Sequence, residues 1–84
     1  MKWCIKRVGP SVLRDSDGMN YQAARAMGFK GYPMKRNTIL VDKRFGPKRM
    51  RETVLHEKLE AALMAKGKGY WDAHRYALKH QNGK

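Results

Sequence analysis

The chain has 84 residues and a formal net charge of +12, which favours anionic partners such as nucleic acid, an acidic protein or an anionic membrane surface. Its length suits one domain with a small core, and the single cysteine, Cys4, excludes an internal disulfide and a cysteine zinc cluster. No stretch approaches the roughly 20 apolar residues of a membrane helix, and early charges argue against a signal peptide. We therefore expect a cytoplasmic protein without a membrane span.

The first part of the chain predicts a strand followed by a turn. Residues 3–8 are rich in strand-forming side chains and end at a Gly-Pro pair. We expect residues 11–13 to add a few extended residues. A turn is then predicted over residues 15–18, where aspartate, serine and glycine gather.

A short helix and a second strand are predicted next. Apolar residues recur at helical spacing within residues 19–27, and Gly28 follows where a C-terminal cap belongs. Residues 29–36 contain glycine, proline and basic residues, which is typical of a loop. Residues 37–42 include a β-branched, apolar run bounded by polar residues and are the clearest strand of the sequence.

Two helices are predicted to fill the rest of the chain. Pro47 suits the first turn of a long helix over residues 47–66, and Gly67 follows its end. A second helix is predicted over residues 70–81, because its apolar face recurs at helical spacing. The sequence therefore predicts one α+β domain over residues 1–84, with a small sheet of two or three strands and a short helix before these two helices. The residues of that apolar face are Tyr70, Ala73, His74, Ala77, Leu78 and Gln81.

The long helix carries two ionisable residues on one face. His56 and Glu60 are four residues apart, so at about 100° per residue they point in nearly one direction. Burial there without a partner would be costly. A metal ion would satisfy both groups; the alternative is that they pair with each other or with a buried tyrosine. The flanking positions are apolar on both sides: Leu55, Leu59, Ala62 and Leu63 on one, and Met50, Val54, Ala61 and Met64 on the other.

His74 lies on the apolar face of the second helix, after a loop short enough to bring it toward the first. Two His and one Glu form a known zinc ligand set, with water in the fourth position when the site is catalytic. We therefore predict zinc bound by His56, Glu60 and His74. Glu57 points roughly 100° from His56 and is predicted as the general base for a zinc-activated water. The alternative for Glu57 is an exposed carboxylate paired with Arg or Lys at i±4.

Residues 56–60, His-Glu-Lys-Leu-Glu, resemble the H-E-x-x-H helix of zincin metallopeptidases with a glutamate in place of the second histidine. Residues 70–77, which contain Ala-His-Arg-Tyr-Ala, resemble the second helix of short gluzincin-like proteins, which presents a third ligand from an A-H-x-x-A type segment. The resemblance covers about residues 37–81. It departs from the family in ligand order, and Gln81 stands where similar proteins carry a further acidic residue.

The resemblance implies a small zinc-dependent metallopeptidase that hydrolyses a peptide or protein substrate, or a catalytically weakened relative. In zincins the strand before the active-site helix often lines the cleft. We therefore expect residues 38–41 to pair with an extended peptide by strand addition.

Two alternatives come from other functional classes. One is a nucleic-acid-binding module, because basic residues cluster through the middle of the chain with aromatic residues among them. The other is an interaction module in which the metal is structural or absent and the histidines are hydrogen-bonded core residues. The basic residues predicted for the first alternative are Lys35, Arg36, Lys43, Arg44, Lys48, Arg49 and Arg51.

Overall fold

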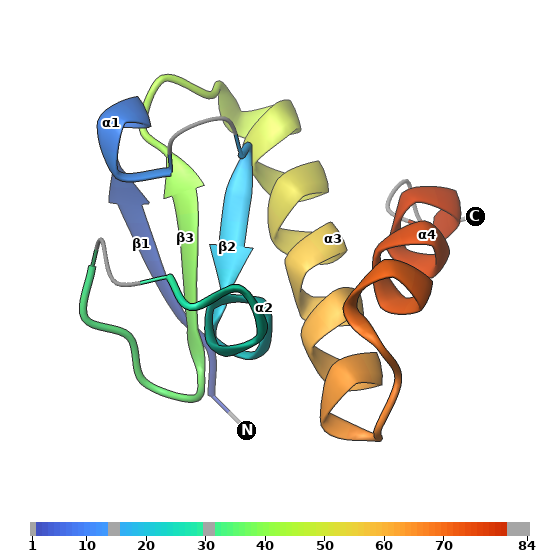
Figure 1. The fold of residues 1–84 in the computed structure, drawn as a ribbon. Coiled ribbons are helices and arrows are strands. Elements are labelled where there is room, and N and C mark those ends of the chain that lie inside the picture. Colours follow the sequence, from blue (N-terminus) through green and yellow to red (C-terminus); the bar gives the residue numbers. More distant parts are fainter. Residues whose placement is uncertain (1, 14–15, 30–31, 81–84) are drawn as a thin grey trace.

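The computed structural model describes residues 2–13, 16–29 and 32–80. These residues form an α+β fold with a three-stranded sheet, a long helix and a C-terminal helix, which confirms the predicted fold class (Figure 1). The elements in chain order are β1 (Cys4–Val8), α1 (Pro10–Leu13), β2 (Gly18–Asn20), α2 (Tyr21–Met27), β3 (Thr38–Asp42), α3 (Pro47–Ala65) and α4 (Tyr70–His80).

The sheet is mixed and has β3 at its centre. β1 pairs with β3 in parallel, with Ile5 opposite Ile39, and β2 pairs with β3 antiparallel, with Met19 opposite Leu40. All five residues of β3 are buried, as the continuous apolar run predicts for a strand covered on both faces. Because both edges of β3 are already paired, the expected strand addition of a peptide to residues 38–41 is wrong.

Two boundaries in the first part of the chain differ from the prediction. Residues 11–13 were expected to be extended, but they belong to α1, where Pro10 occupies a favourable first-turn position and Leu13 is buried. Residues 19–20 were expected in a helix, but they end β2, and α2 begins one residue later. Asn20 has extended backbone angles and caps α2, since its side-chain oxygen accepts a hydrogen bond from the Ala23 backbone N–H at 2.8 Å.

The two long helices form successive layers beside the sheet. In Figure 1, α3 runs alongside β2 and α4 packs on the far side of α3. The chain reverses between them at Gly67, whose φ of 102° favours glycine. Ala73 and Ala77 are fully buried and let α4 approach α3 closely. Leu78 was predicted on the same buried face, but it is 51% exposed.

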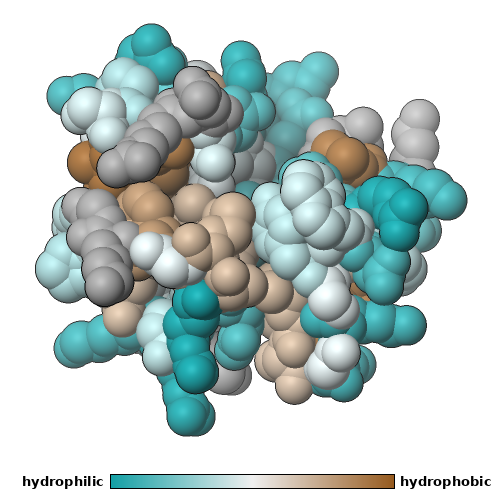
Figure 2. All heavy atoms as spheres, viewed as in Figure 1, coloured by the Kyte–Doolittle hydropathy of each residue, from teal (hydrophilic) through white to brown (hydrophobic). Residues whose placement is uncertain are grey.

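The core lies between the sheet and the helices. One cluster of buried apolar residues joins the end of β1, the middle of β2, the helices α1 and α2, and the centre of β3. In the view of Figure 2, hydrophilic residues surround a band of apolar residues that crosses the middle of this face. The cluster consists of Val8, Leu13, Met19, Ala23, Ala24 and Leu40.

No helix within the described ranges combines the length and the apolar character needed to cross a membrane.

Candidate metal centre

The most buried positions of α3 are mainly polar, which corrects the expected apolar arc. Leu55 and Leu59 are only half-buried, and Ala62 is exposed. This face of α3 turns toward β2, α2 and α4. The polar groups on it need partners, because burying them unpaired would be costly. The buried residues of α3 are Thr53, His56, Glu57, Glu60 and Ala61.

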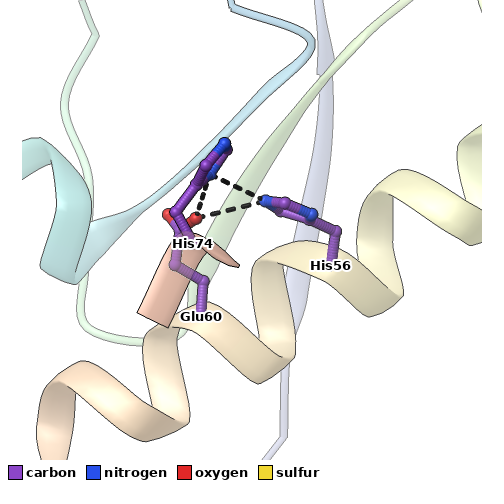
Figure 3. Close-up of side chains that lie close together, drawn as sticks. All are labelled: His56, Glu60 and His74. Carbon is purple, nitrogen blue, oxygen red and sulfur yellow. Dashed lines mark hydrogen bonds and ion pairs between the residues drawn. The ribbon is translucent and has the colours of Figure 1, made fainter. Parts of the chain in front are cut away.

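The structure brings the three predicted zinc ligands to one point. His56 Nε2 lies 3.1 Å from Glu60 Oε2, His74 Nδ1 lies 2.9 Å from the same oxygen, and the two nitrogens are 3.3 Å apart. Figure 3 shows both imidazole rings and the carboxylate directed toward one another from α3 and α4. The three residues also form a group whose side-chain donor atoms could hold one metal ion.

The spacing of the donor atoms fits a zinc ion. Ligand atoms about 2.0–2.1 Å from a tetrahedral zinc lie about 3.3 Å from one another. The separations of 3.1, 2.9 and 3.3 Å are close to this value. Two imidazole nitrogens and one carboxylate oxygen are also a donor set that zinc accepts, and three protein ligands leave a fourth position for water.

Glu60 is held in the state that a metal ligand requires. Burial by itself would raise the pKa of Glu60, but the hydrogen bonds and charges of His56 and His74 outweigh it and lower this pKa below its usual value. The carboxylate is therefore ionised at neutral pH although it is almost fully buried.

Asn20 completes the polar network and was missed by the sequence analysis. Its side-chain Nδ2 donates to Glu57 Oε1 at 2.9 Å and to Glu60 Oε1 at 3.0 Å. This contact fixes the Glu60 carboxylate and leaves Oε2 facing the two imidazoles. The sequence does contain one signal, because asparagine is a preferred N-cap three residues before Ala23. That signal locates the start of α2, but it does not reveal contacts to residues 37 and 40 positions away.

Glu57 is buried beside the three-residue group. Only 5% of it is exposed, so the alternative of an exposed surface ion pair is wrong. Burial and the charge of Glu60 raise the pKa of Glu57 to about 7, against the opposing effect of the Asn20 hydrogen bond. A carboxyl group with this pKa can take up and release a proton near neutral pH.

An open cleft of about 900 Å³ gives access to this centre. His56, Glu57, Glu60 and His74 all contribute to its lining. Tyr70, one turn before His74, stacks on the His74 ring with centroids 5.5 Å apart and an interplanar angle of 22°. Burial raises the pKa of Tyr70, as do the nearby carboxylates, so its hydroxyl stays protonated.

Gly18 allows β2 to approach α3 closely at the cleft wall. A Cβ atom at this position would lie 2.8 Å from Thr53 Cγ2, 3.1 Å from the Leu40 carbonyl oxygen and 3.3 Å from Glu57 Cγ. Any larger residue would therefore push on the segment of α3 that carries His56 and Glu57.

The basic residues proposed for nucleic-acid binding do not form one cluster. Lys35 and Arg36 precede β3, while the other five follow it, so a whole strand separates the two groups. Two of the five have carboxylate partners: Arg44 pairs with buried Asp42 at 2.8 Å, and Arg49 pairs with Asp17 at 3.3 Å. The five residues after β3 are Lys43, Arg44, Lys48, Arg49 and Arg51.

Comparisons with protein-family models, curated proteins and solved structures found no match for this chain. The zincin-like resemblance over residues 37–81 therefore stays a prediction, as do the single domain over residues 1–84 and the identity of the metal. Gln81, where the sequence departs from that family, lies outside the described residues.

Proposed function

We propose that the protein is a small zinc-dependent metallopeptidase in which His56, Glu60 and His74 hold the metal. The observation that carries this proposal is the convergence of their three donor atoms, at separations of 2.9 to 3.3 Å, on the wall of an open cleft. The resemblance of residues 56–60 and 70–77 to zincins supports a peptide substrate.

In peptide hydrolysis, the residues of the site would have separate roles. Zinc bound by such a set would polarise the scissile carbonyl and lower the pKa of a water molecule to about 7. Glu57, with Oε1 held by Asn20, would accept the proton of the attacking water at Oε2. Its pKa of about 7 suits it to pass that proton to the leaving amine. Tyr70, stacked on His74, would hold that imidazole in its orientation.

Metal binding is tested by elemental analysis of protein purified without chelator and without an affinity tag. We expect one zinc ion per chain, and we expect His56→Ala and His74→Ala to lose it. His80→Ala is the matched control, because His80 lies on α4 with His74 but its ring packs on Tyr76 instead. A folded wild-type protein that binds no zinc even when zinc is added would refute the proposal.

Catalysis needs a separate experiment on the zinc-loaded protein. We expect Glu57→Gln to keep its zinc and to lower peptide hydrolysis by about 100-fold or more, because the general base is removed. Hydrolysis of a mixed peptide library, read by mass spectrometry, gives the rate without assuming a sequence preference. A Glu57→Gln variant as active as the wild type would refute this assignment, and a zinc-loaded wild type that cleaves no peptide would refute the peptidase proposal.

A further inference from the structure

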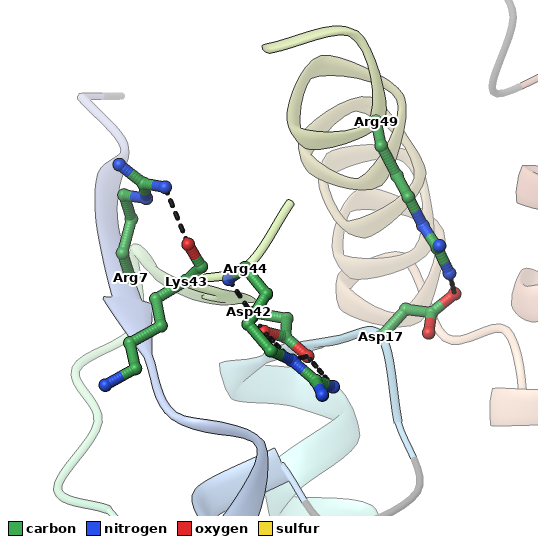
Figure 4. A network of polar contacts seen from close by, with 6 residues as sticks. All are labelled: Arg7, Asp17, Asp42, Lys43, Arg44 and Arg49. Atoms are coloured by element: carbon green, nitrogen blue, oxygen red, sulfur yellow. Dashed lines mark hydrogen bonds and ion pairs between the residues drawn. The ribbon is translucent and has the colours of Figure 1, made fainter. Parts of the chain in front are cut away.

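Cationic side chains from distant parts of the sequence meet at one end of the molecule. β1 and β3 are parallel, so their carboxyl ends lie together, and the Arg7 guanidinium donates a 2.7 Å hydrogen bond to the Lys43 carbonyl oxygen. Figure 4 shows Arg7 beside Lys43, Arg44 next to Lys43, and Arg49 on the neighbouring helix α3. We call this surface the cationic end. We define it as the exposed basic residues near the end of β1, directly after β3 and in the first turns of α3: Arg7, Lys43, Arg44, Lys48, Arg49 and Arg51.

Several of these cations are held in fixed positions. Arg44 is anchored by three side-chain hydrogen bonds to Asp42, and the Arg49 guanidinium lies 4.2 Å from the centre of the Phe45 ring. Arg7 is held by a neutral carbonyl group and so keeps its full charge. Cations outnumber carboxylates on these segments, where the described acidic residues are Asp17, Asp42 and Glu52. Although Arg44 and Arg49 are paired with Asp42 and Asp17, the surface keeps a net positive charge, which favours an anionic ligand.

The cationic end continues into the cleft of the metal centre. Lys48 and Arg49 line the same cleft as His56, Glu60 and His74, together with the carboxylates of Asp17, which pairs with Arg49, and Glu52. A ligand bound to these two cations therefore extends toward the proposed zinc ligands. At about 1.5 Å per residue along α3, Arg49 and His56 are roughly 10 Å apart, which is about three residues of an extended peptide.

The other residues that line the cleft distinguish between a polypeptide and a nucleic acid as the anionic ligand. A polar edge of the cleft is formed by Ser16, Asp17, Glu52 and Thr53. The walls beyond that edge are largely apolar, and two of their side chains, Met27 and Leu78, are about half exposed. Apart from Lys48 and Arg49, no lysine or arginine among the described residues lines the cleft, so a continuing phosphate backbone would meet no further cation there. The apolar walls also adjoin the carboxylates of Glu57 and Glu60. A nucleic acid carries its charge along its whole length, whereas a polypeptide can be acidic in one segment and apolar in the next. These apolar walls are formed by Met19, Ala23, Met27, Tyr70 and Leu78.

We propose that the cationic end binds an acidic segment of a polypeptide substrate, whose adjoining apolar residues lie in the cleft beside His56, Glu60 and His74. This inference rests on the proposed peptidase function and adds the class of substrate. Phe45 supports the same choice, since Arg49 already lies over one face of its ring, which is therefore not open to a stacked base.

The test measures binding apart from hydrolysis, on zinc-loaded Glu57→Gln protein and fluorescein-labelled probes. The first probe is a peptide with a run of Asp and Glu followed by Leu and Phe. The second is its counterpart with Asn and Gln, and the third is a single-stranded oligonucleotide of equal charge. We expect the acidic peptide to bind at least about tenfold more tightly than the neutral one. This binding should weaken as the salt concentration rises to about 0.3 M.

The variants separate a local site from the overall charge of the protein. Lys48→Glu with Arg51→Glu should weaken acidic-peptide binding about tenfold. Lys35→Glu with Arg36→Glu removes the same charge at the opposite end of β3 and should have little effect. Both pairs are exposed, and glutamate near the start of α3 favours the helix, so we expect both variants to fold. Lys48→Gln with Arg51→Gln is a milder variant, because it removes the two positive charges without reversing them.

Three results would overturn the inference: equal losses in the two variants, equal binding of the acidic and neutral peptides, or tighter binding of the oligonucleotide. The last would identify the cationic end as a nucleic-acid surface. Charge-dependent binding at this end, without hydrolysis of any peptide by the zinc-loaded wild type, would instead contradict only the peptidase function.

Discussion

Asn20 connects both carboxylates of the centre to the start of α2. Its amide donates to Glu57 and Glu60 while its oxygen caps the helix. We expect Asn20→Asp to destabilise the metal-free protein by about 3 kcal/mol at pH 7, because a third carboxylate would then lie against two buried ones. Aspartate caps helices as well as asparagine does, so this loss would not come from α2.

Urea unfolding at pH 7 and pH 5 measures this effect. The loss should shrink at pH 5, where the crowded carboxylates can share protons. A loss below about 1 kcal/mol at both pH values, which is the size of an ordinary substitution, would show that the Asn20 bridge contributes little.

Glu57 should make the stability of the metal-free protein depend on pH. Its pKa is about 7 in the folded chain and near 4.5 in the unfolded chain, so the folded state binds the proton more tightly. This contribution to stability is complete below pH 4.5, declines as pH rises, and is lost above pH 7. Glu57→Gln imitates the protonated form, so its melting temperature should exceed that of the wild type by several degrees at pH 8.

Thermal unfolding of chelator-treated protein at pH 8 and pH 5 checks this prediction. The advantage of the glutamine variant should be smaller at pH 5. If the difference between the two proteins is the same at both pH values, Glu57 does not titrate in this range.

At the scale of elements, the centre depends on the close approach of β2 to α3. Gly18→Ala would place a Cβ atom within 2.8 Å of Thr53 Cγ2, and overpacking of this kind costs about 1–3 kcal/mol. Because the same Cβ meets Glu57 Cγ, we also expect slower hydrolysis. Gly46→Ala is the matched control, since nothing lies within 4 Å of its added Cβ and its φ is −74°. Equal stability of the two variants would contradict this account of the β2–α3 contact.

The elements predicted best are those marked by a pattern within their own residues. The spacing of His56 and Glu60 within one helix, and of His74 on the next, predicts three side chains that can meet because one short loop joins the helices. The strand at β3 is likewise marked by its own apolar run. In contrast, α1 and β2 are only four and three residues long, too short for a period to emerge, and their form depends on contacts with β3.

At the scale of the whole molecule, the fold class and the three convergent side chains could be predicted, but the support around them could not. The contact of Asn20 with Glu57 and Glu60 crosses 37 and 40 residues. The buried state of Glu57 depends on β2 and α2 packing over α3, and the partition of the basic residues to opposite ends of β3 depends on the sheet. Contacts of this kind depend on tertiary packing, and the spacing of residues along the sequence does not predict them.

The three convergent donors come from a single helix–loop–helix, with His56 and His74 only 18 positions apart. Asn20, which locks the carboxylates, joins from the opposite half of the chain. Short-range contacts form sooner than long-range ones during folding. If the chain refolds in the presence of zinc, we therefore expect the α3–α4 pair to bind the metal weakly at first. The affinity for zinc should rise only when the sheet packs against α3, so that metal uptake followed over time shows two phases.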